Sequence, residues 1–378
     1  MKGFLKSKKG LIYLTVGNLL SASLIGMFWL LLASIQTVEE YGKINYEIAL
    51  ASLLASAALL GLNTTLLKFI PKGLKKIHIQ ANQVVLISAG VAAVIAAMID
   101  WMLGFFVIGM AFWMMTTYEL LGKKQYKQYS LIMIGARASK FALAIGLYYL
   151  LRIPGIILGF AIGYLVFSHR FFISVKQFSF DFDEVKGKMK FSSHAYSFNM
   201  SNAIFMFFDK LVIVPLFGFA ALGFYQLGFQ FLLFMGMIPI SFYQYLIPEE
   251  SSGLKKTKLR TLGFVFSLLL MGLIFVASPW LLDTFFPHFS SSIDGFRIMS
   301  LGIVPMMIVW ISNSRFLSQD KTKFVVIGSA IFVTLQIFLF FYLGEIYGVM
   351  GLAIAVVVAL SAQAAFLYGT IRKLKIGF

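Results

Sequence analysis

Apolar runs of about 20 residues alternate with short polar segments along the whole chain. A helix of about 20 apolar residues is long enough to cross the ~30 Å hydrocarbon core of a bilayer. The first run continues to about residue 34 with no small-residue cleavage site after it, so we expect a retained membrane helix rather than a signal peptide. The pattern predicts an all-α integral membrane protein of about 12 transmembrane helices, near residues 10–34, 44–70, 81–101, 103–121, 130–151, 154–174, 195–217, 220–247, 258–282, 296–316, 323–343 and 346–371.

Basic residues concentrate in every second loop of this pattern. The chain has 32 Lys and Arg against 15 Asp and Glu. If the N-terminus is inside, 26 of the basic residues fall in the inner segments, and only Lys43, Arg152 and Arg297 fall in the outer loops. Cytoplasmic loops are enriched in Lys and Arg, so this bias predicts that the N- and C-termini are both cytoplasmic. The net charge of +17 is then a signal of topology, and we expect no nucleic-acid partner.

The chain also carries a weak internal repeat. Residues 153–162 align with residues 346–354 when one residue is dropped, and an Asn and a Tyr bound both 18–41 and 202–225 at the same spacing. Parallel repeats of six helices build some secondary transporters. The predicted organisation is an N-terminal six-helix bundle in residues 1–174, a polar cytoplasmic linker in 175–194 and a C-terminal six-helix bundle in 195–378.

Common catalytic signatures are missing from the sequence. It has no cysteine, no P-loop, no dinucleotide-binding fingerprint, no H-E-x-x-H and no G-x-S-x-G. The four histidines have no ligand-like spacing. Asp181 and Asp183 have the spacing of a glycosyltransferase metal motif, but we interpret them as charges of a solvated linker. The sequence therefore predicts no enzyme, no metal site and no bound cofactor.

Ionisable residues at membrane depth are the candidate functional residues, because a charge there is costly and usually faces a partner or a watery cavity. Arg137 and Lys140 share one face of a predicted helix, about 10 and 15 Å from its inner end. They either face a cavity, where they would bind a diphosphate, or extend to the inner headgroups. Asp209 and Lys210 lie beyond the middle of a later span and need not pair with each other. Glu47 lies at a depth that allows contact with Lys210.

Uncharged polar and small residues in the spans have two interpretations. Asn18 and Asn63, in the first two spans, either line a cavity or form hydrogen bonds between helices. Gly155, Gly159 and Gly163 repeat every four residues, so they form a stripe that lets another helix approach closely. We interpret this stripe as a packing surface.

Several fragments resemble Wzx-type polysaccharide flippases, which belong to the multidrug/oligosaccharidyl-lipid/polysaccharide (MOP) exporter superfamily. Their order and spacing make the resemblance fairly specific, and they cover about two thirds of the predicted spans. The fragments are GN at 17–18, EYG at 40–42, GLNTT at 61–65 with Lys68 and Pro71, FDKLVIVPLFG at 208–218, ALGFY at 221–225, LIPEE at 246–250 and GVMGLAI at 348–354.

The resemblance implies two six-helix bundles around a central cavity that opens to each side in turn. It also implies a flippase of the cytoplasmic (inner) membrane that moves a polyprenyl-diphosphate-linked oligosaccharide for surface polysaccharide biosynthesis. The family's Asp-Lys pair carries over to Asp209 and Lys210, whereas Arg137 and Lys140 are substrate-binding candidates by their chemistry alone.

The expected roles follow from this resemblance and from the depth of each residue. Arg137, Lys140, Lys210, Asn18 and Asn63 are expected to bind substrate, and Asp209 and Glu47 to gate or couple transport. The expected energy source is a proton or sodium gradient, or the membrane potential alone. The expected partners are membrane lipid and the glycan polymerases or glycosyltransferases of the same pathway.

Two other functions remain open. The first is a drug or cation exporter of the same superfamily, which would need acidic residues at mid-depth, where cations prevail here. The second is a membrane-embedded glycan polymerase or glycosyltransferase. Such enzymes typically need a sizeable outer loop, and the largest predicted one, about residues 283–295, is short and apolar.

Overall fold

The computed structural model describes residues 2–74, 76–177, 181–251, 257–319 and 321–374, and within them the chain is helical without strands. Lys255, Lys256, Lys375 and the side chains of residues 246–250 lie outside the described part. The elements are α1 (Lys2–Ile35), α2 (Val38–Ala58), α3 (Leu62–Phe69), η1 (Ile70–Lys72), α4 (Ile77–Ala97), α5 (Trp101–Gly122), α6 (Tyr126–Leu151), α7 (Ile153–Val166), α8 (His169–Lys176), α9 (Asp183–Lys186), α10 (Met189–Ser251), α11 (Thr257–Phe285), η2 (Pro287–Ser292), α12 (Ile293–Leu301), α13 (Ile303–Ser318) and α14 (Thr322–Lys373).

Eight helices among the described residues are long and apolar enough to cross a membrane, or up to ten if each of two bent pairs counts as one span. The bent pairs are α2 with α3 (53°) and α7 with α8 (57°). Two long helices are interrupted by non-helical backbone, α10 at Gly218 and α14 at Gly348. The chain is thus a multi-pass membrane protein, while the count of twelve and the side on which the termini lie stay predictions.

Local sequence explains where several helices begin and end. The α2–α3 bend follows Leu60 and Gly61, which both have positive φ angles. The predicted boundary between the spans 81–101 and 103–121 corresponds to the break between α4 and α5. There the Asp100 carboxylate caps α5 by accepting a hydrogen bond from the Met102 N–H (3.0 Å). The expected span 296–316 lies within one candidate membrane span, Pro287–Leu317, in which a turn at Gly302 separates α12 from α13.

The described helices form two compact units. Unit 1 is Met1–Phe28 with Tyr46–Leu211, and unit 2 is Trp29–Asn45 with Val212–Phe378. The segment 175–194 thus packs within unit 1, and a short segment around the start of α2 packs within unit 2. The division into six-helix bundles at residues 1–174 and 195–378 stays a prediction.

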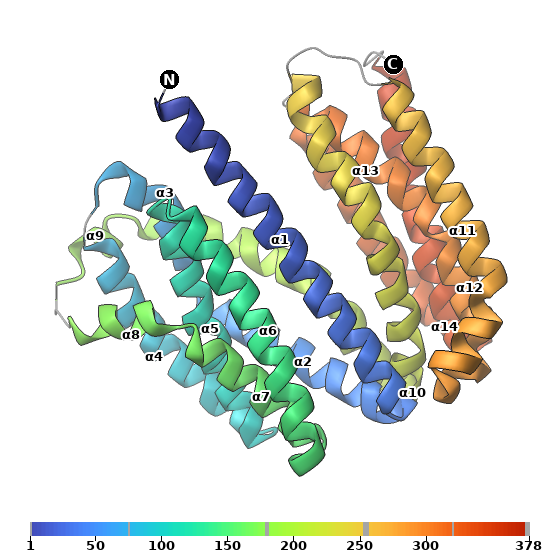
Figure 1. Cartoon of the computed structure of the whole chain (residues 1–378), viewed down its shortest axis with the longest axis horizontal. Coiled ribbons are helices and arrows are strands. Elements are labelled where there is room, and N and C mark those ends of the chain that lie inside the picture. Colours follow the sequence, from blue (N-terminus) through green and yellow to red (C-terminus); the bar gives the residue numbers. More distant parts are fainter. Residues whose placement is uncertain (1, 75, 178–180, 252–256, 320, 375–378) are drawn as a thin grey trace. The chain divides into compact units, whose positions relative to one another are not determined.

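In unit 1, α7 packs closely along α6 and α5 (Figure 1). The glycine stripe of α7 makes this approach possible, because a Cβ at each position would overlap α6. Gly155 lies against Leu147 and Tyr148, Gly159 against Leu143 and Ala144, and Gly163 against Lys140. The interpretation of this stripe as a packing surface is confirmed.

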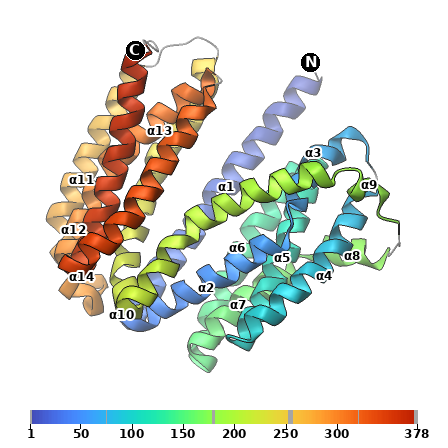
Figure 2. The same ribbon diagram turned by 180° about the vertical axis from the view of Figure 1, so that it is seen from behind.

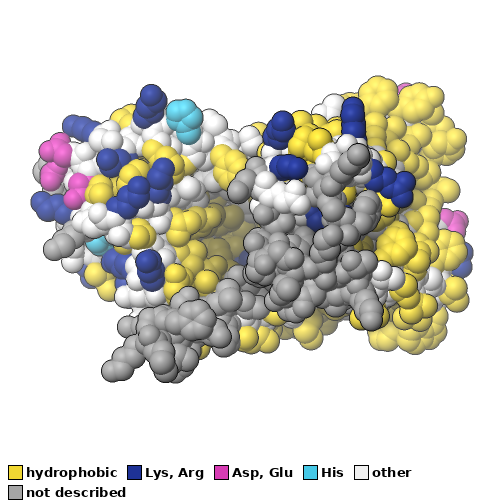
Figure 3. Space-filling model, turned by 90° about the horizontal axis from the view of Figure 1, so that it is seen from above, with side chains coloured by type: hydrophobic (Ala, Val, Ile, Leu, Met, Phe, Trp, Pro, Cys, Tyr) yellow, Lys and Arg dark blue, Asp and Glu magenta, His cyan; other side chains and the backbone are white. Residues whose placement is uncertain are grey.

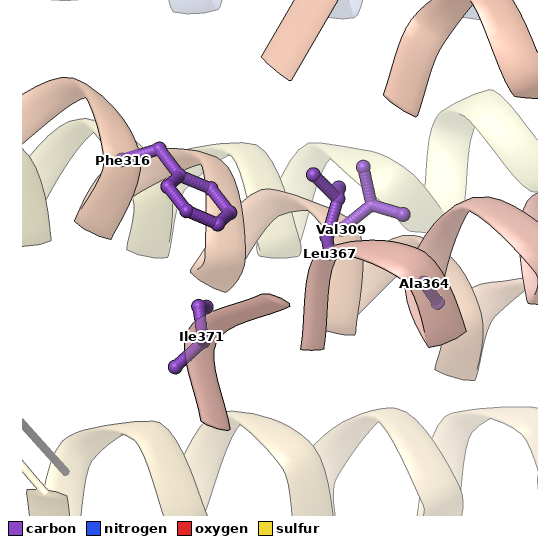
Figure 4. Packing of buried hydrophobic residues seen from close by; sticks show 5 residues of the cluster. All are labelled: Val309, Phe316, Ala364, Leu367 and Ile371. Atoms are coloured by element: carbon purple, nitrogen blue, oxygen red, sulfur yellow. The ribbon is translucent and has the colours of Figure 1, made fainter. Parts of the chain in front are cut away.

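In unit 2, α11, α12 and α13 pack with one another, and α12 and α13 also pack on α14 (Figure 2). Part of the core lies between α13 and α14, where the buried side chains of Val309, Phe316, Ala364, Leu367 and Ile371 form one cluster (Figure 4). The start of α2 crosses the second part of α10 within the same unit. Gly42 contacts the Phe219 carbonyl, and Gly223 contacts the Val38 carbonyl. Because neither glycine has a Cβ, the backbones of α2 and α10 are in direct contact at this crossing.

One local feature of the predicted repeat, the turn before α7 and its counterpart within α14, is present three residues away from the register that the sequence suggested. Arg152 (φ 59°, ψ −137°) and Gly348 (φ 57°, ψ −134°) have the same backbone conformation at the turn before a helix. Three residues later, Gly155 and Gly351 pack under the carbonyls of Leu147 and Leu343. The sequence comparison paired Gly155 with Gly348, because it could not distinguish a glycine at the turn from a glycine in the packed helix.

Candidate functional site

Lys140 is enclosed in an aromatic box inside unit 1. Its side chain is 1% exposed, and its Nζ forms no hydrogen bond in the described structure. The Nζ lies 3.9 Å from the ring centroid of Tyr164, 4.9 Å from that of Phe160 and 5.9 Å from that of Trp113. Such cation–π contacts stabilise the charge by about 2 kcal/mol or more when the cation is desolvated. In this structure Lys140 is shielded from open space.

Arg137 lies one turn before Lys140 on α6 and is half-buried. Its guanidinium carbon is 5.9 Å from the Trp113 ring, and its Nε is buried without a hydrogen bond. Trp113 therefore contacts both predicted cations. Neither cation forms an ion pair with another described residue, although charges at membrane depth are usually paired.

Asp209 and Lys210 pair with each other, which the sequence did not require. The Lys210 Nζ is 3.0 Å from one Asp209 carboxylate oxygen and 3.2 Å from the other, and both side chains are buried. The long lysine side chain bends back to reach its neighbour, so the 100° separation on the helix does not prevent contact. Glu47 is buried in the same unit, and its contact with Lys210 stays a prediction.

Asn63 and Asn18 have different surroundings. Asn63 is buried and accepts a hydrogen bond from Asn199 Nδ2 (3.0 Å), which joins α3 to α10 within unit 1. Asn18 on α1 is exposed. In this conformation Asn63 links helices, and of the two asparagines only Asn18 is accessible.

We expect Asn63→Ala to lower the stability of unit 1. The change removes the side-chain hydrogen bond from Asn199 that joins α3 to α10, and such a bond is worth about 0.6 kcal/mol and at most about 1.7 kcal/mol in membrane proteins. Thermal unfolding of the purified protein in detergent would measure the loss, with the exposed Asn18→Ala as the matched control. An unchanged melting temperature together with reduced transport would instead indicate that Asn63 contacts substrate.

One buried acidic residue, Glu119, was not predicted from the sequence. Glu119 on α5 is 2% exposed and pairs with Lys123 (2.6 Å) and with Arg170 of α8 (3.4 Å). These residues line a polar pocket of about 350 Å³ together with His78 and His169. The sequence signal was the Glu–Lys spacing of four residues at the end of a predicted span, which is typical of a helical ion pair. The Arg170 contact depends on tertiary structure.

Comparison with known proteins identifies the fold. No family model and no curated protein matches the sequence. One similar solved structure, "Lipid II flippase MurJ, inward closed conformation", has a TM-score of 0.70 at 17% identity and covers 97% of this chain and 90% of that chain. A second, an inward-facing "multidrug resistance MATE family transporter of the MOP superfamily", has a TM-score of 0.69 at 14% identity and covers 97% of this chain and 98% of that chain.

A third solved structure is a MOP superfamily transporter from Pyrococcus furiosus. It has a TM-score of 0.57 at 14% identity and covers 98% of this chain and 96% of that chain, and its description reads "Reverse polarity of binding pocket suggests different function". All three similarities extend over nearly the whole length of both chains. The protein is therefore a multi-pass membrane protein with the fold of the MOP-superfamily transporters.

Proposed function

We propose that this protein is a flippase that moves a polyprenyl-diphosphate-linked oligosaccharide across the cytoplasmic membrane. One observation carries the proposal: Arg137 and Lys140 are two neighbouring cations on a membrane-spanning helix that have no carboxylate partner among the described residues. Leaving a cation unpaired in an apolar setting is costly, so such cations usually serve an anion that binds and leaves. A diphosphate is an anion that can cross with its lipid carrier.

The two cations would have different roles in this mechanism. The half-buried Arg137 offers a planar set of donors that matches phosphate oxygens. Lys140 is buried in its aromatic box and would attract the same anion without direct contact. The attraction between two charges is reduced less by low-dielectric surroundings than by water. Alternating access requires that the diphosphate bind the two states differently, and movement of Trp113, which contacts both cations, would couple binding to that change.

The proposal also includes the groups that couple transport to an ion gradient and the protein partners of the flippase. The buried Asp209–Lys210 pair is a candidate group for gating transport or coupling it to an ion gradient. Glu47 is the other candidate, for protons or sodium. Glycan polymerases and glycosyltransferases of the same pathway are the proposed protein partners.

A drug or cation exporter is the second candidate function, favoured by the similarity to a multidrug transporter with a TM-score of 0.69. The fold does not separate the two functions, since the lipid flippase has a TM-score of 0.70. The charge of Arg137 and Lys140 supports the lipid flippase, since these residues would attract a diphosphate and repel a cationic drug.

We expect Arg137→Gln to slow flipping by about 10- to 100-fold, because a charge-assisted contact with phosphate contributes about 1.5–3 kcal/mol. The measurement uses proteoliposomes that contain a fluorescent polyprenyl-diphosphate oligosaccharide, with a membrane-impermeant quencher to report its movement between leaflets. Transport of a fluorescent organic cation is measured in the same vesicles.

Arg372→Gln is the matched control, because Arg372 is exposed and contacts only Tyr368 among the described residues. It should flip the lipid at the wild-type rate. Wild-type flipping by Arg137→Gln would exclude the diphosphate role. Transport of the organic cation without lipid flipping would instead support the exporter.

A further inference from the structure

A separate apolar pocket lies in unit 1 under the segment that connects α8 to α10. Its volume is about 520 Å³. Val185 of α9 is buried beside it, and the Val185 N–H donates a hydrogen bond to Gln80 of α4 (3.1 Å), which holds the short helix in place. The lining side chains are mostly apolar and come from the α2–α3 bend, α4, α9 and α10, including Leu60, Val84, Phe182, Met189, Ser193 and Tyr196. This volume and the apolar lining suit a hydrocarbon chain.

A cluster of lysines and aromatic rings lies next to this pocket. The rings of Phe69 (end of α3) and Phe191 (start of α10) contact edge to face, with centroids 5.3 Å apart. The Lys68 Nζ is 3.9 Å from the Phe191 centroid, the Lys72 Nζ is 5.5 Å from the Phe69 centroid, and the Lys188 Nζ is 5.2 Å from the same centroid. We call these five residues the basic platform.

The geometry of α10 joins the pocket to the basic platform. Met189, Ser192, Ser193 and Tyr196 line the pocket and repeat at the spacing of one helix face. Lys188 and Phe191 are three residues apart on the neighbouring face. Lys188 directly precedes Met189, so a ligand with a chain in the pocket would have its polar end within reach of the platform.

No described acidic residue compensates the charges of the basic platform. Lys68, Lys72 and Lys188 form no ion pair with a described residue, and their recorded contacts are with aromatic rings. The nearby linker acid Asp181 is already paired with Lys76 at 3.7 Å. Figure 3 shows many Lys and Arg side chains beside hydrophobic ones on this end of unit 1. The platform is thus suited to an anion that has an apolar part.

We propose that the pocket and the basic platform together form a binding site for an anionic phospholipid of the surrounding bilayer, with one acyl chain in the pocket and the phosphate on the lysines. Clusters of lysine at a membrane surface attract anionic headgroups by about 1 kcal/mol per residue. Each buried methylene of the chain adds about 0.8 kcal/mol. The site lies within one unit and does not depend on the proposed flippase function.

The test measures lipid retained by the purified full-length protein. The protein is mixed in detergent with phosphatidylglycerol or with phosphatidylcholine of the same acyl chains, and bound lipid is counted by native mass spectrometry. We expect one phosphatidylglycerol molecule to be retained in preference to phosphatidylcholine. Replacing Lys68, Lys72 and Lys188 together by Gln should weaken this binding on the order of 100-fold.

Two further variants separate the parts of the site. Ser193→Trp fills the pocket but keeps all three lysines, and it should also abolish the preferential binding. Replacing the exposed Lys127, Lys176 and Lys373 by Gln removes the same charge elsewhere and should change nothing. Equal retention of both phospholipids, or unchanged retention by the platform variant, would refute the site. If a polyprenyl phosphate added in the same assay were retained selectively in place of phosphatidylglycerol, the proposed phospholipid occupant would be wrong.

Discussion

Gly42→Ala is expected to destabilise unit 2 by about 3 kcal/mol or more, and Gly223→Ala should do the same. A Cβ at Gly42 would overlap the Phe219 carbonyl, and a Cβ at Gly223 would overlap the Val38 carbonyl. Both obstacles are backbone atoms that no rotamer change can move, so the two helices must separate. Inserting a carbon into a well-packed core ordinarily costs about 1–3 kcal/mol, and a rigid neighbour increases this cost.

Fluorescence-detected size-exclusion chromatography after heating would measure this loss as a lower apparent melting temperature. Gly272→Ala is the matched control, since a Cβ there meets no atom within 4 Å, and alanine favours a helix by about 1 kcal/mol over glycine. The double variant should cost less than the sum of the single variants, because the first one already separates the helices. Wild-type stability of both single variants would show that the backbones do not touch at this crossing.

Lys140→Met is expected to raise stability while reducing transport. Moving an ammonium group out of water costs several kcal/mol, and the aromatic box returns about 2 kcal/mol of this cost. Methionine has a similar length and needs no counter-ion, so the variant should gain about 1–4 kcal/mol. Retaining a destabilising charge is a common feature of functional sites.

Thermal unfolding in detergent and the proteoliposome flipping assay together test this trade-off. Lys127→Met on the same helix is exposed and should change neither quantity. A loss of stability in Lys140→Met would mean that the lysine contributes to packing rather than to transport. A gain in stability with unchanged flipping would show that the charge is not used.

The sequence identified the charges at membrane depth but not the residues that surround them. Arg137, Lys140, Asp209 and Lys210 were recognisable because a charge inside a long apolar run is rare and costly. Their surroundings were not recognisable. Trp113, Phe160 and Tyr164 are three aromatic residues among many in apolar helices, and only the packing of α5, α6 and α7 brings them around one Nζ atom.

Glycine presented a similar difficulty. The stripe at Gly155, Gly159 and Gly163 was recognised as a packing surface, since its spacing by itself defines a face of a helix. The turn before α7 is formed by Arg152, and the corresponding turn within α14 is formed by Gly348. The two residues differ although their backbone conformations are the same. Only the dihedral angles therefore showed which residues of the two segments correspond.

By itself the sequence determined the class of this protein: a chain of apolar helices with basic ends, because hydrocarbon thickness and the cost of buried charge act on each segment separately. Only the tertiary structure decided which charges are paired, which are enclosed and which helices touch. These properties depend on contacts between distant segments, such as Asn63 with Asn199 or Lys68 with Phe191, and the energy of each contact arises only when the helices have packed.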